Sequence, residues 1–483
     1  MIERSAVPPS SALAPARACA LASALASALV LGGCMSFIPA YERPAAPIAG
    51  VYAPELMPAG AGSVSAADIE WQRYFSDPRL KRLIETALQN NRDLRVAVLN
   101  IEQARAAYQV RRADELPSLG AGGLASRQVG SNGKLGNTYA VGLQVTGYEL
   151  DLFGRVRSLS QAALSQYLAT EEARKTVQIA LVAAVANAYI GLLADDETSR
   201  VTRDTLATRE DSFRLTKLKF DNGVSSELDF RQAEQLLEGA RAALAQSQRQ
   251  RLLDENALVL LLGQALPADL PAALTMTAQQ TLADLPAGLP SELLTRRPDV
   301  RAAEQQLLAA NANIGAARAA FFPRIALTAN AGTASGELSG LFKSGTFALT
   351  GSATLLQPIF DAGRNRANLD VAKVNKEIAI AQYEKSIQTA FREVADSLAG
   401  RATLGEQLRA LTAQTTAAQV TLKLADLRYR NGAASYFDVL DAQRSLFAAQ
   451  LATVQAQTLQ VQNGVTLYKV LGGGWTEPSI RSN

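Results

Sequence analysis

Two stretches of the chain are almost alike: LTKLKFDNGVSSELDFRQAE at residues 215–234 and LADLRYRNGAASYFDVLDAQ at residues 424–443. Each ends a long helical pattern at Asn-Gly and begins another at Ser-x-x-Asp. Glycine after asparagine fits a left-handed helix C-cap, and Ser-x-x-Asp fits a capping box at the start of the next helix. Each stretch therefore predicts the tip of an antiparallel helical hairpin, made twice per chain.

The repeated turn is part of an internal duplication. A helix-ending proline (Pro117, Pro323), a Gly-Arg pair and the Asn-Gly turn follow one another in the same order and at similar spacing in both halves. Two long helical patterns, Arg155–Asp221 and Arg364–Arg430, lead to the turns, and each could extend on the order of 100 Å. In the second pattern, apolar residues recur at steps of three and four, which predicts a packing seam: Ile387, Phe391, Val394 and Leu398, then Val420, Leu424 and Leu427.

Between the proline and the long helical pattern, each half carries two short segments with period-two alternation. In TYAVGLQVTGY (138–148), Tyr, Val, Leu and Val share one face, and Ala, Gly, Gln and Thr share the other. Such segments are typical of a transmembrane β-barrel, although a soluble sandwich with one buried face has the same pattern. Four strands cannot close a barrel, and an open edge cannot lie in lipid. The membrane interpretation therefore requires an oligomer, and a trimer would supply twelve strands and an aqueous bore.

The N-terminus has the features of a secretory signal. Two arginines precede the apolar run ACALASALASALVL, which is too short to span a bilayer, and small residues follow it. A buried helix is the alternative interpretation. Leu31-Gly32-Gly33-Cys34 resembles a bacterial lipobox, which makes Cys34 the acylated first residue of the mature protein. No later segment has 18 or more uninterrupted apolar residues, so we expect no transmembrane helix.

Composition removes several classes of function. The chain has no histidine, so Ser-His-Asp and Cys-His catalysis and imidazole metal sites are excluded. Lys plus Arg number 48 and Asp plus Glu 45, a balance that gives no reason to expect nucleic-acid binding. We expect no enzyme activity, no metal and no cofactor other than a covalent lipid on Cys34.

Three further segments carry a resemblance to a known family. GLPSELLTRRPDVRAAEQQLLAANANIGAARAAFFPRI (288–325), LRYRNGAASYFDVLDAQRSLFAAQ (427–450) and LYKVLGGGW (467–475) resemble outer-membrane efflux lipoproteins of the TolC-like outer-membrane factor family, NodT-type branch. The resemblance implies an α+β membrane protein: a homotrimer with a twelve-stranded transmembrane barrel, four strands per chain, on a periplasmic α-helical barrel. It also implies a Gram-negative outer-membrane location, a periplasmic adaptor and an inner-membrane pump as partners, and passive export of small molecules. A type I protein secretion duct and a periplasmic coiled-coil scaffold without a pore are the alternatives.

The resemblance also assigns residues to a periplasmic gate. Asp441 aligns with a gate aspartate, Phe437 with an apolar constricting residue and Asp438 with a second acidic position. Tyr429 and Asp229 align with residues that link neighbouring hairpins, whereas Ala434 replaces the linking arginine of TolC. Helix capping alone would also explain Asp229 and Asp438, and Asp441 could be an ordinary surface acid. The expected adaptor contacts are Asn222, Gly223, Val224, Ser225 and Ser226 in the first turn and Asn431, Gly432, Ala433, Ala434 and Ser435 in the second.

The sequence also predicts how the chain is divided. A signal peptide occupies residues 1–33, and an acylated linker with part of an equatorial belt occupies 34–80. The remaining divisions are a first repeat at 81–270 (strands at about 118–150, hairpin 155–263), an equatorial connector at 271–297, a second repeat at 298–475 (strands at about 324–358, hairpin 364–471) and a tail at 476–483. Within these, Arg296-Arg297-Pro298-Asp299 predicts a helix start, because proline suits the first helical position and an acid suits the first turn.

Overall fold

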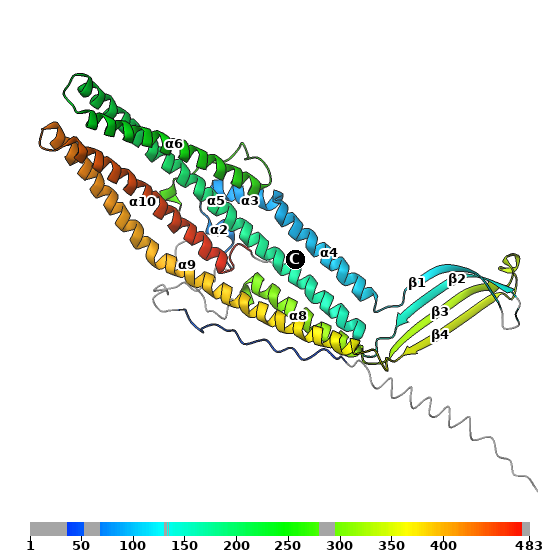
Figure 1. Ribbon diagram of the computed structural model, residues 1–483. Coiled ribbons are helices and arrows are strands. Elements are labelled where there is room, and N and C mark those ends of the chain that lie inside the picture. Colours follow the sequence, from blue (N-terminus) through cyan, green and yellow to red (C-terminus); the bar gives the residue numbers. More distant parts are fainter. Residues whose placement is uncertain (1–35, 53–67, 130–132, 134, 280–294, 476–483) are drawn as a thin grey trace, which may run out of the picture. The chain divides into compact units, whose positions relative to one another are not determined.

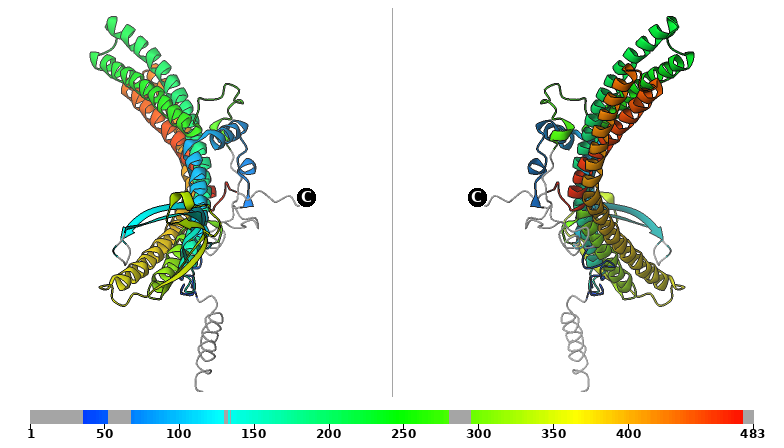
Figure 2. Two further views of the ribbon diagram at one scale, coloured as in Figure 1. Left: turned by 90° about the vertical axis from the view of Figure 1, so that its right-hand side faces the viewer. Right: turned by 90° about the vertical axis from the view of Figure 1, so that its left-hand side faces the viewer.

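The computed structural model describes residues 36–52, 68–129, 133, 135–279 and 295–475. Cys34, the tail and most of the expected equatorial connector lie outside these residues. Contacts divide the chain into two compact units, each built from both repeats (Figure 1 and Figure 2). The strand-bearing unit takes its described residues from 36–43, 103–167 and 305–380, and the helical unit takes the rest. The elements are α2 (Trp71–Tyr74), α3 (Pro78–Asn90), α4 (Arg92–Ala113), β1 (Leu119–Val129), β2 (Leu135–Glu149), α5 (Arg155–Asp221), α6 (Glu227–Leu262), η3 (Met276–Ala278), α8 (Pro298–Ala319), β3 (Arg324–Ser335), η4 (Leu338–Gly340), β4 (Phe347–Leu356), α9 (Arg364–Arg430) and α10 (Tyr436–Val470).

The four strands form one antiparallel sheet in the order β1-β2-β3-β4, so the strand hairpins of the two repeats join at β2 and β3. The register puts like residues in rows across the sheet. One row is Ala121, Leu143, Ala331 and Leu349, and the next row on the opposite face is Gly120, Gln144, Asn330 and Thr350. The predicted apolar face and small-polar face are therefore confirmed.

The apolar face of the sheet is uncovered in the single chain. Leu143 is 51% exposed, Leu349 73% and Phe347 71%. Within the described residues, β1 and β4 each have a strand neighbour on one side only. An apolar sheet face with two open edges is unstable in water and cannot enter lipid until its edges are paired.

Two glycines bring β2 and β3 close together. Gly142 and Gly332 face each other in the register. A Cβ atom added to Gly142 would lie 2.6 Å from the Cα atom of Gly332, and one added to Gly332 would overlap the carbonyl oxygen of Val141. Only glycine fits this pair, because the obstacle is backbone that cannot move aside.

We expect Gly332→Ala to destabilise the sheet by about 1–3 kcal/mol through overpacking. The measurement is the thermal unfolding midpoint of the purified protein in detergent. Gly351→Ala in β4 is the matched control, because nothing lies within 4 Å of a Cβ atom there. Equal midpoints for the two variants would contradict the steric account.

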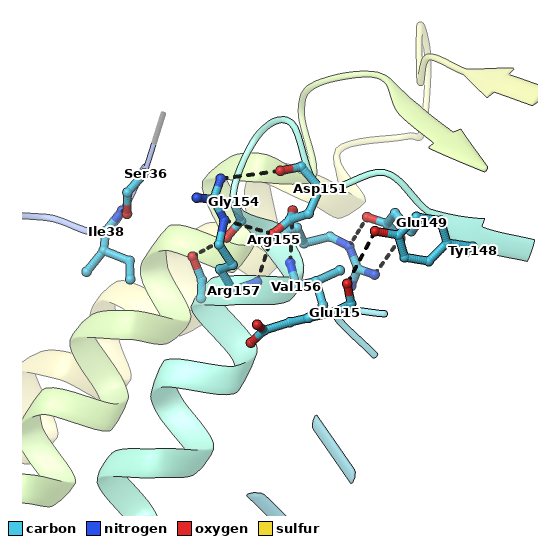
Figure 3. A network of polar contacts seen from close by, with 11 residues as sticks. Ser36, Ile38, Glu115, Tyr148, Glu149, Asp151, Gly154, Arg155, Val156 and Arg157 are labelled. Atoms are coloured by element: carbon cyan, nitrogen blue, oxygen red, sulfur yellow. Dashed lines mark hydrogen bonds and ion pairs between the residues drawn. The ribbon is translucent and has the colours of Figure 1, made fainter. Parts of the chain in front are cut away.

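Ion pairs secure the junction between β2 and α5 (Figure 3). Glu149, at the end of β2, accepts two hydrogen bonds from the Arg155 guanidinium at 2.7 and 2.6 Å. Asp151 accepts from the backbone N–H groups of Val156 and Arg157 at 3.1 and 2.8 Å, so it caps the first turn of α5. The strand therefore passes into the helix through a short turn that side-chain hydrogen bonds hold at both ends.

The long helices have the bounds that the sequence predicted, 67 residues each. Both turns close with a left-handed glycine, Gly223 at φ 72° and Gly432 at φ 69°. The N–H groups of Gly223 and Val224 donate to the carbonyls of Phe220 and Lys219, which is a Schellman motif, and the second turn repeats it. The predicted C-caps are confirmed.

The capping-box prediction is right for the second turn and half right for the first. Asp438 accepts from the backbone N–H of Ser435 at 2.9 Å, while its own N–H donates to the Ser435 hydroxyl, so the box is complete. In the first turn, the Asp229 N–H donates to the Ser226 hydroxyl, but the Asp229 carboxylate accepts from the hydroxyls of Ser225 and Ser226. The extra hydroxyl of Ser225, where the second turn has alanine, provides the competing donor.

The predicted seam divides into two parts. Ile387, Val394 and Leu398 are fully buried, and the ring of Phe391 stacks on Tyr52 with 4.9 Å between centroids. Val420, Leu424 and Leu427 are more than half exposed, so no described part of this chain covers the rest of the seam. An amphipathic pattern indicates that one face of a helix is covered in the assembled protein. It does not indicate whether the same chain or another chain covers that face.

Two helical features bear on other predictions. One 18-residue window of α5 is long and apolar enough to cross a membrane, but 56% of it is buried, as in the core helix of a protein.

Pro298 begins α8 as predicted. Arg297 before it is buried and bonds Asp299, Glu393 and the carbonyl of Val470, which supports the structural interpretation of this motif.

A carboxyl pair joins α5 and α6. Burial raises the pKa of Asp195 to about 7, helped by a hydrogen bond that the protonated Asp195 shares with Asp254 and by the negative charge of Asp254. The Nε2 of Gln250 donates to Asp254 at 3.0 Å. In the folded protein Asp195 therefore holds a proton that an exposed aspartate would lose at a pH of about 4.

We expect the stability contributed by this proton to be complete below a pH of about 4 and to be lost as the pH rises through 7. Asp195→Asn removes the charge, so its unfolding midpoint should exceed that of the wild type at pH 8 and vary less between pH 5 and 8. The control is Asp221→Asn, because Asp221 is on the same helix, is exposed and pairs with Lys217 at 3.0 Å. An unchanged pH slope in Asp195→Asn would contradict the shared proton.

Candidate periplasmic gate

The two hairpin tips are the exposed ends of the helical unit. Nine of the ten residues predicted to contact an adaptor are glycine, alanine, serine or asparagine, and the tenth, Val224, is 75% exposed. Ser225 and Ala434 are partly buried, and the other eight are exposed. The tips therefore offer polar backbone, small side chains and one large apolar side chain to a partner.

Phe437 and Asp441 lie together on one exposed face of α10. They are four residues apart in the helix, so their side chains are neighbours. Phe437 is 51% exposed, and Asp441 is exposed as well. The carboxylate of Asp438 accepts the hydrogen bond of the helix cap described above. The structure thus brings together the predicted constriction residues and assigns capping to the second acidic position.

The residues expected to link hairpins have partners that the sequence did not indicate. The Tyr429 hydroxyl accepts a hydrogen bond from the Nζ of Lys219 at 3.0 Å, and this ammonium lies 4.7 Å from the centre of the Tyr429 ring. Lys219 is in the last turn of α5 and Tyr429 in the last turn of α9, so the bond joins the two hairpins of one chain. Asp229 bonds the serines of its own turn.

An apolar cluster beneath this bond holds the hairpins side by side. Leu236 of α6 packs with Tyr436, Val439 and Leu440 of α10, with Tyr429 at its edge. Burial raises the pKa of the Tyr436 hydroxyl. A groove of about 710 Å³ opens next to the cluster, lined among others by Lys219, Tyr429 and Tyr436.

Lys219 is not among the residues that the sequence predicted for the gate. Its only local signal is its position near a helix C-terminus. A basic side chain there interacts favourably with the dipole of any helix, so the position does not indicate a special role. Lys219 and Tyr429 are 210 positions apart, so no spacing rule connects them. In the described residues, no cluster of three or more His, Cys, Asp or Glu could hold a metal ion.

Comparisons with known proteins agree with this geometry. The model of the outer membrane efflux protein family matches residues 83–264 and 289–473. The probable efflux pump outer membrane protein TtgC of Pseudomonas putida is 48% identical over 466 residues, which cover 95% of this chain and 96% of the relative. The outer membrane protein OprJ of Pseudomonas aeruginosa is 46% identical over 93% of this chain and 95% of its own length.

Solved structures share the fold. The open state of the MtrE outer membrane channel of Neisseria gonorrhoeae is 43% identical and superposes with a TM-score of 0.84, covering 91% of this chain and 98% of that one. The CmeC outer membrane channel of Campylobacter jejuni is 25% identical with a TM-score of 0.84, covering 91% of this chain and 95% of that one. The chain therefore belongs to the outer membrane efflux protein family and has the fold of its outer-membrane channels.

Proposed function

We propose that this Gram-negative outer-membrane efflux protein assembles as a homotrimer that forms the exit duct of a tripartite efflux system. The observation that carries the proposal is the four-stranded sheet with an exposed apolar face and two open edges. Three copies pair every edge and give twelve strands, enough for an aqueous bore. Conduction through such a duct is passive, so it requires no enzyme activity, metal or cofactor.

The exposed seam supports the same assembly. Val420, Leu424 and Leu427 of α9 lie in a row that this chain does not cover. Leu215 and Leu218 of α5 are also more than half exposed. Rows of large apolar side chains on long helices pack against other helices, and the neighbouring subunit of a helical barrel supplies them.

The lipid on Cys34 would be held close to the strand-bearing unit. The Phe37 ring stacks on Phe322 with 4.6 Å between centroids, and Asn311 of α8 donates to the carbonyl of Pro39 at 2.8 Å. Cys34 is three residues before Phe37, a distance that the chain spans in about 10 Å at most. The acyl chains would then reach the bilayer next to the junction between α8 and β3, where Phe322 lies, without further linker.

At the other end, the tips would contact a periplasmic adaptor that couples the duct to an inner-membrane pump. The cargo would be small organic molecules supplied by that pump. Relatives at 48% and 47% identity are described as antibiotic and solvent efflux pump outer membrane proteins.

Inside the tip, three copies of Phe437 and Asp441 would form an apolar constriction and a ring of three carboxylates. Like charges in a narrow bore attract cations, which would block the closed channel.

The gate proposal predicts the behaviour of the channel in planar bilayers. We expect Asp441→Ala to raise the leak conductance, and to raise the divalent-cation concentration for half block by about tenfold, because the ring loses its charge. Gln232→Ala is the control, since Gln232 holds the equivalent place in the first repeat. Unchanged leak and block would make Asp441 an ordinary surface acid.

The same experiment tests the channel itself. Replacement of both Phe437 and Asp441 by alanine should remove the constriction and give steady conductance. A folded trimer of this double variant that conducts no current would overturn the proposal that the protein is a duct.

Lys219 gives a separate prediction for opening. Lys219→Met removes a hydrogen bond and a cation–π contact, together about 1–2 kcal/mol, and should raise the leak conductance. Tyr429→Phe keeps the ring and should have a smaller effect. Lys217→Met is the control, because Lys217 is exposed and pairs with Asp221 at 3.0 Å. A Lys219→Met channel as tight as the wild type would show that this bond does not hold the gate.

A further inference from the structure

Arg209 is a buried cation in the helical unit. It belongs to α5 and is 6% exposed. One guanidinium nitrogen, Nη1, donates to the carbonyl of Leu236 in α6 at 3.0 Å, and the guanidinium lies 5.2 Å from the centre of the Phe447 ring in α10. In the part of the chain that the structure describes, the Nε atom has no hydrogen-bond partner and no carboxylate pairs with this side chain.

A second positive charge adds to the imbalance. Burial and then the positive charge of Arg444 on α10 lower the pKa of Arg209. An ordinary arginine pKa is so high that the group still carries its charge at neutral pH. A buried ion without a counter-ion is strongly unfavourable, so buried charges in proteins are paired or bind ions.

A small cavity lies beside this guanidinium. Its volume is about 110 Å³, and its lining includes Arg209, Thr205, Gln443, Gln450 and Phe447. The side chains of Thr205 and Gln450 can donate hydrogen bonds, and the aromatic ring closes the apolar side. Asp204 also borders the cavity, but its carboxylate accepts from Arg200 at 2.9 Å. The space is sufficient for a small ion and a few waters.

We propose that this cavity binds a small monovalent anion of the size of chloride, with the Arg209 guanidinium as its principal donor. Because Arg209 is buried within one chain, a counter-ion must be small enough to enter the cavity. The corresponding position of the second repeat is Ala418, so the site occurs once per chain. The bound anion would lie between α5 and α10, with α9 at the border of the cavity, and it would stabilise the packing of one hairpin on the other.

The test compares thermal unfolding of the full-length protein in sodium chloride and in sodium gluconate at equal ionic strength, which matches charge screening. Gluconate is a much larger anion than chloride, so it should fit a cavity of about 110 Å³ poorly. We expect the midpoint to be about 2 °C or more higher in chloride and to increase with the logarithm of its concentration. R209M keeps a long side chain without the charge and should lose this difference.

R214M is the matched control, since Arg214 is on the same helix, is exposed and pairs with Asp211. It should keep the chloride effect. Equal wild-type midpoints in the two salts, or a chloride effect that persists in R209M, would overturn the site. A second measurement covers an R209M protein that does not fold: wild-type crystals grown in bromide should show an anomalous peak within hydrogen-bond distance of the Arg209 guanidinium, and its absence would also overturn the site.

Discussion

Strand edges in lipid must be paired, because hydrocarbon offers no water to the backbone N–H and C=O groups. This chain has four strands and leaves two edges open within its described residues. The rest of the structure depends on that constraint. It requires several copies, and it places the N-terminal strand hairpin of one copy beside the C-terminal strand hairpin of another. The long helices α5 and α9 follow β2 and β4 along the chain, and the exposed apolar row on α9 needs a neighbour as well.

The duplication provides two hairpins of equal length, and their differences make the tip asymmetric. Both turns share the left-handed glycine and the serine cap, because the backbone reverses direction in the same way. The first turn has Ser225 and Leu228, whereas the second has Ala434 and Phe437. Lys219 in one hairpin and Tyr429 in the other then form a hydrogen bond. This bond needs one residue from each repeat, so a single repeat could not form it.

Local pattern was enough to predict most elements from the sequence. Alternation located the strands and their two faces, and Gly-Arg and Asn-Gly bounded α5 and α9 at the observed residues. The features that the sequence did not reveal depend on contacts between distant residues. The backbone contact of Gly142 with Gly332 needs the register of β2 on β3, and the Lys219–Tyr429 bond needs the packing of two hairpins. The Asp229 carboxylate accepts from the Ser225 hydroxyl and not from the backbone N–H of the N-cap residue. This outcome depends on distances that the Ser-x-x-Asp motif does not specify.

The glycine contact between β2 and β3 has a consequence for what the barrel can select. Gly142 and Gly332 share a row with Gly122 and Ala348, on the face opposite the apolar one. In a closed barrel, this row would form a band of the inner wall in which the strands themselves carry at most a methyl group, and the amide of Gln144 from the next row lies over Gly122. A solute at that level would meet backbone and this one kind of polar side chain. Such a band offers few groups with which to recognise a solute, so any selectivity at this level would depend on Gln144.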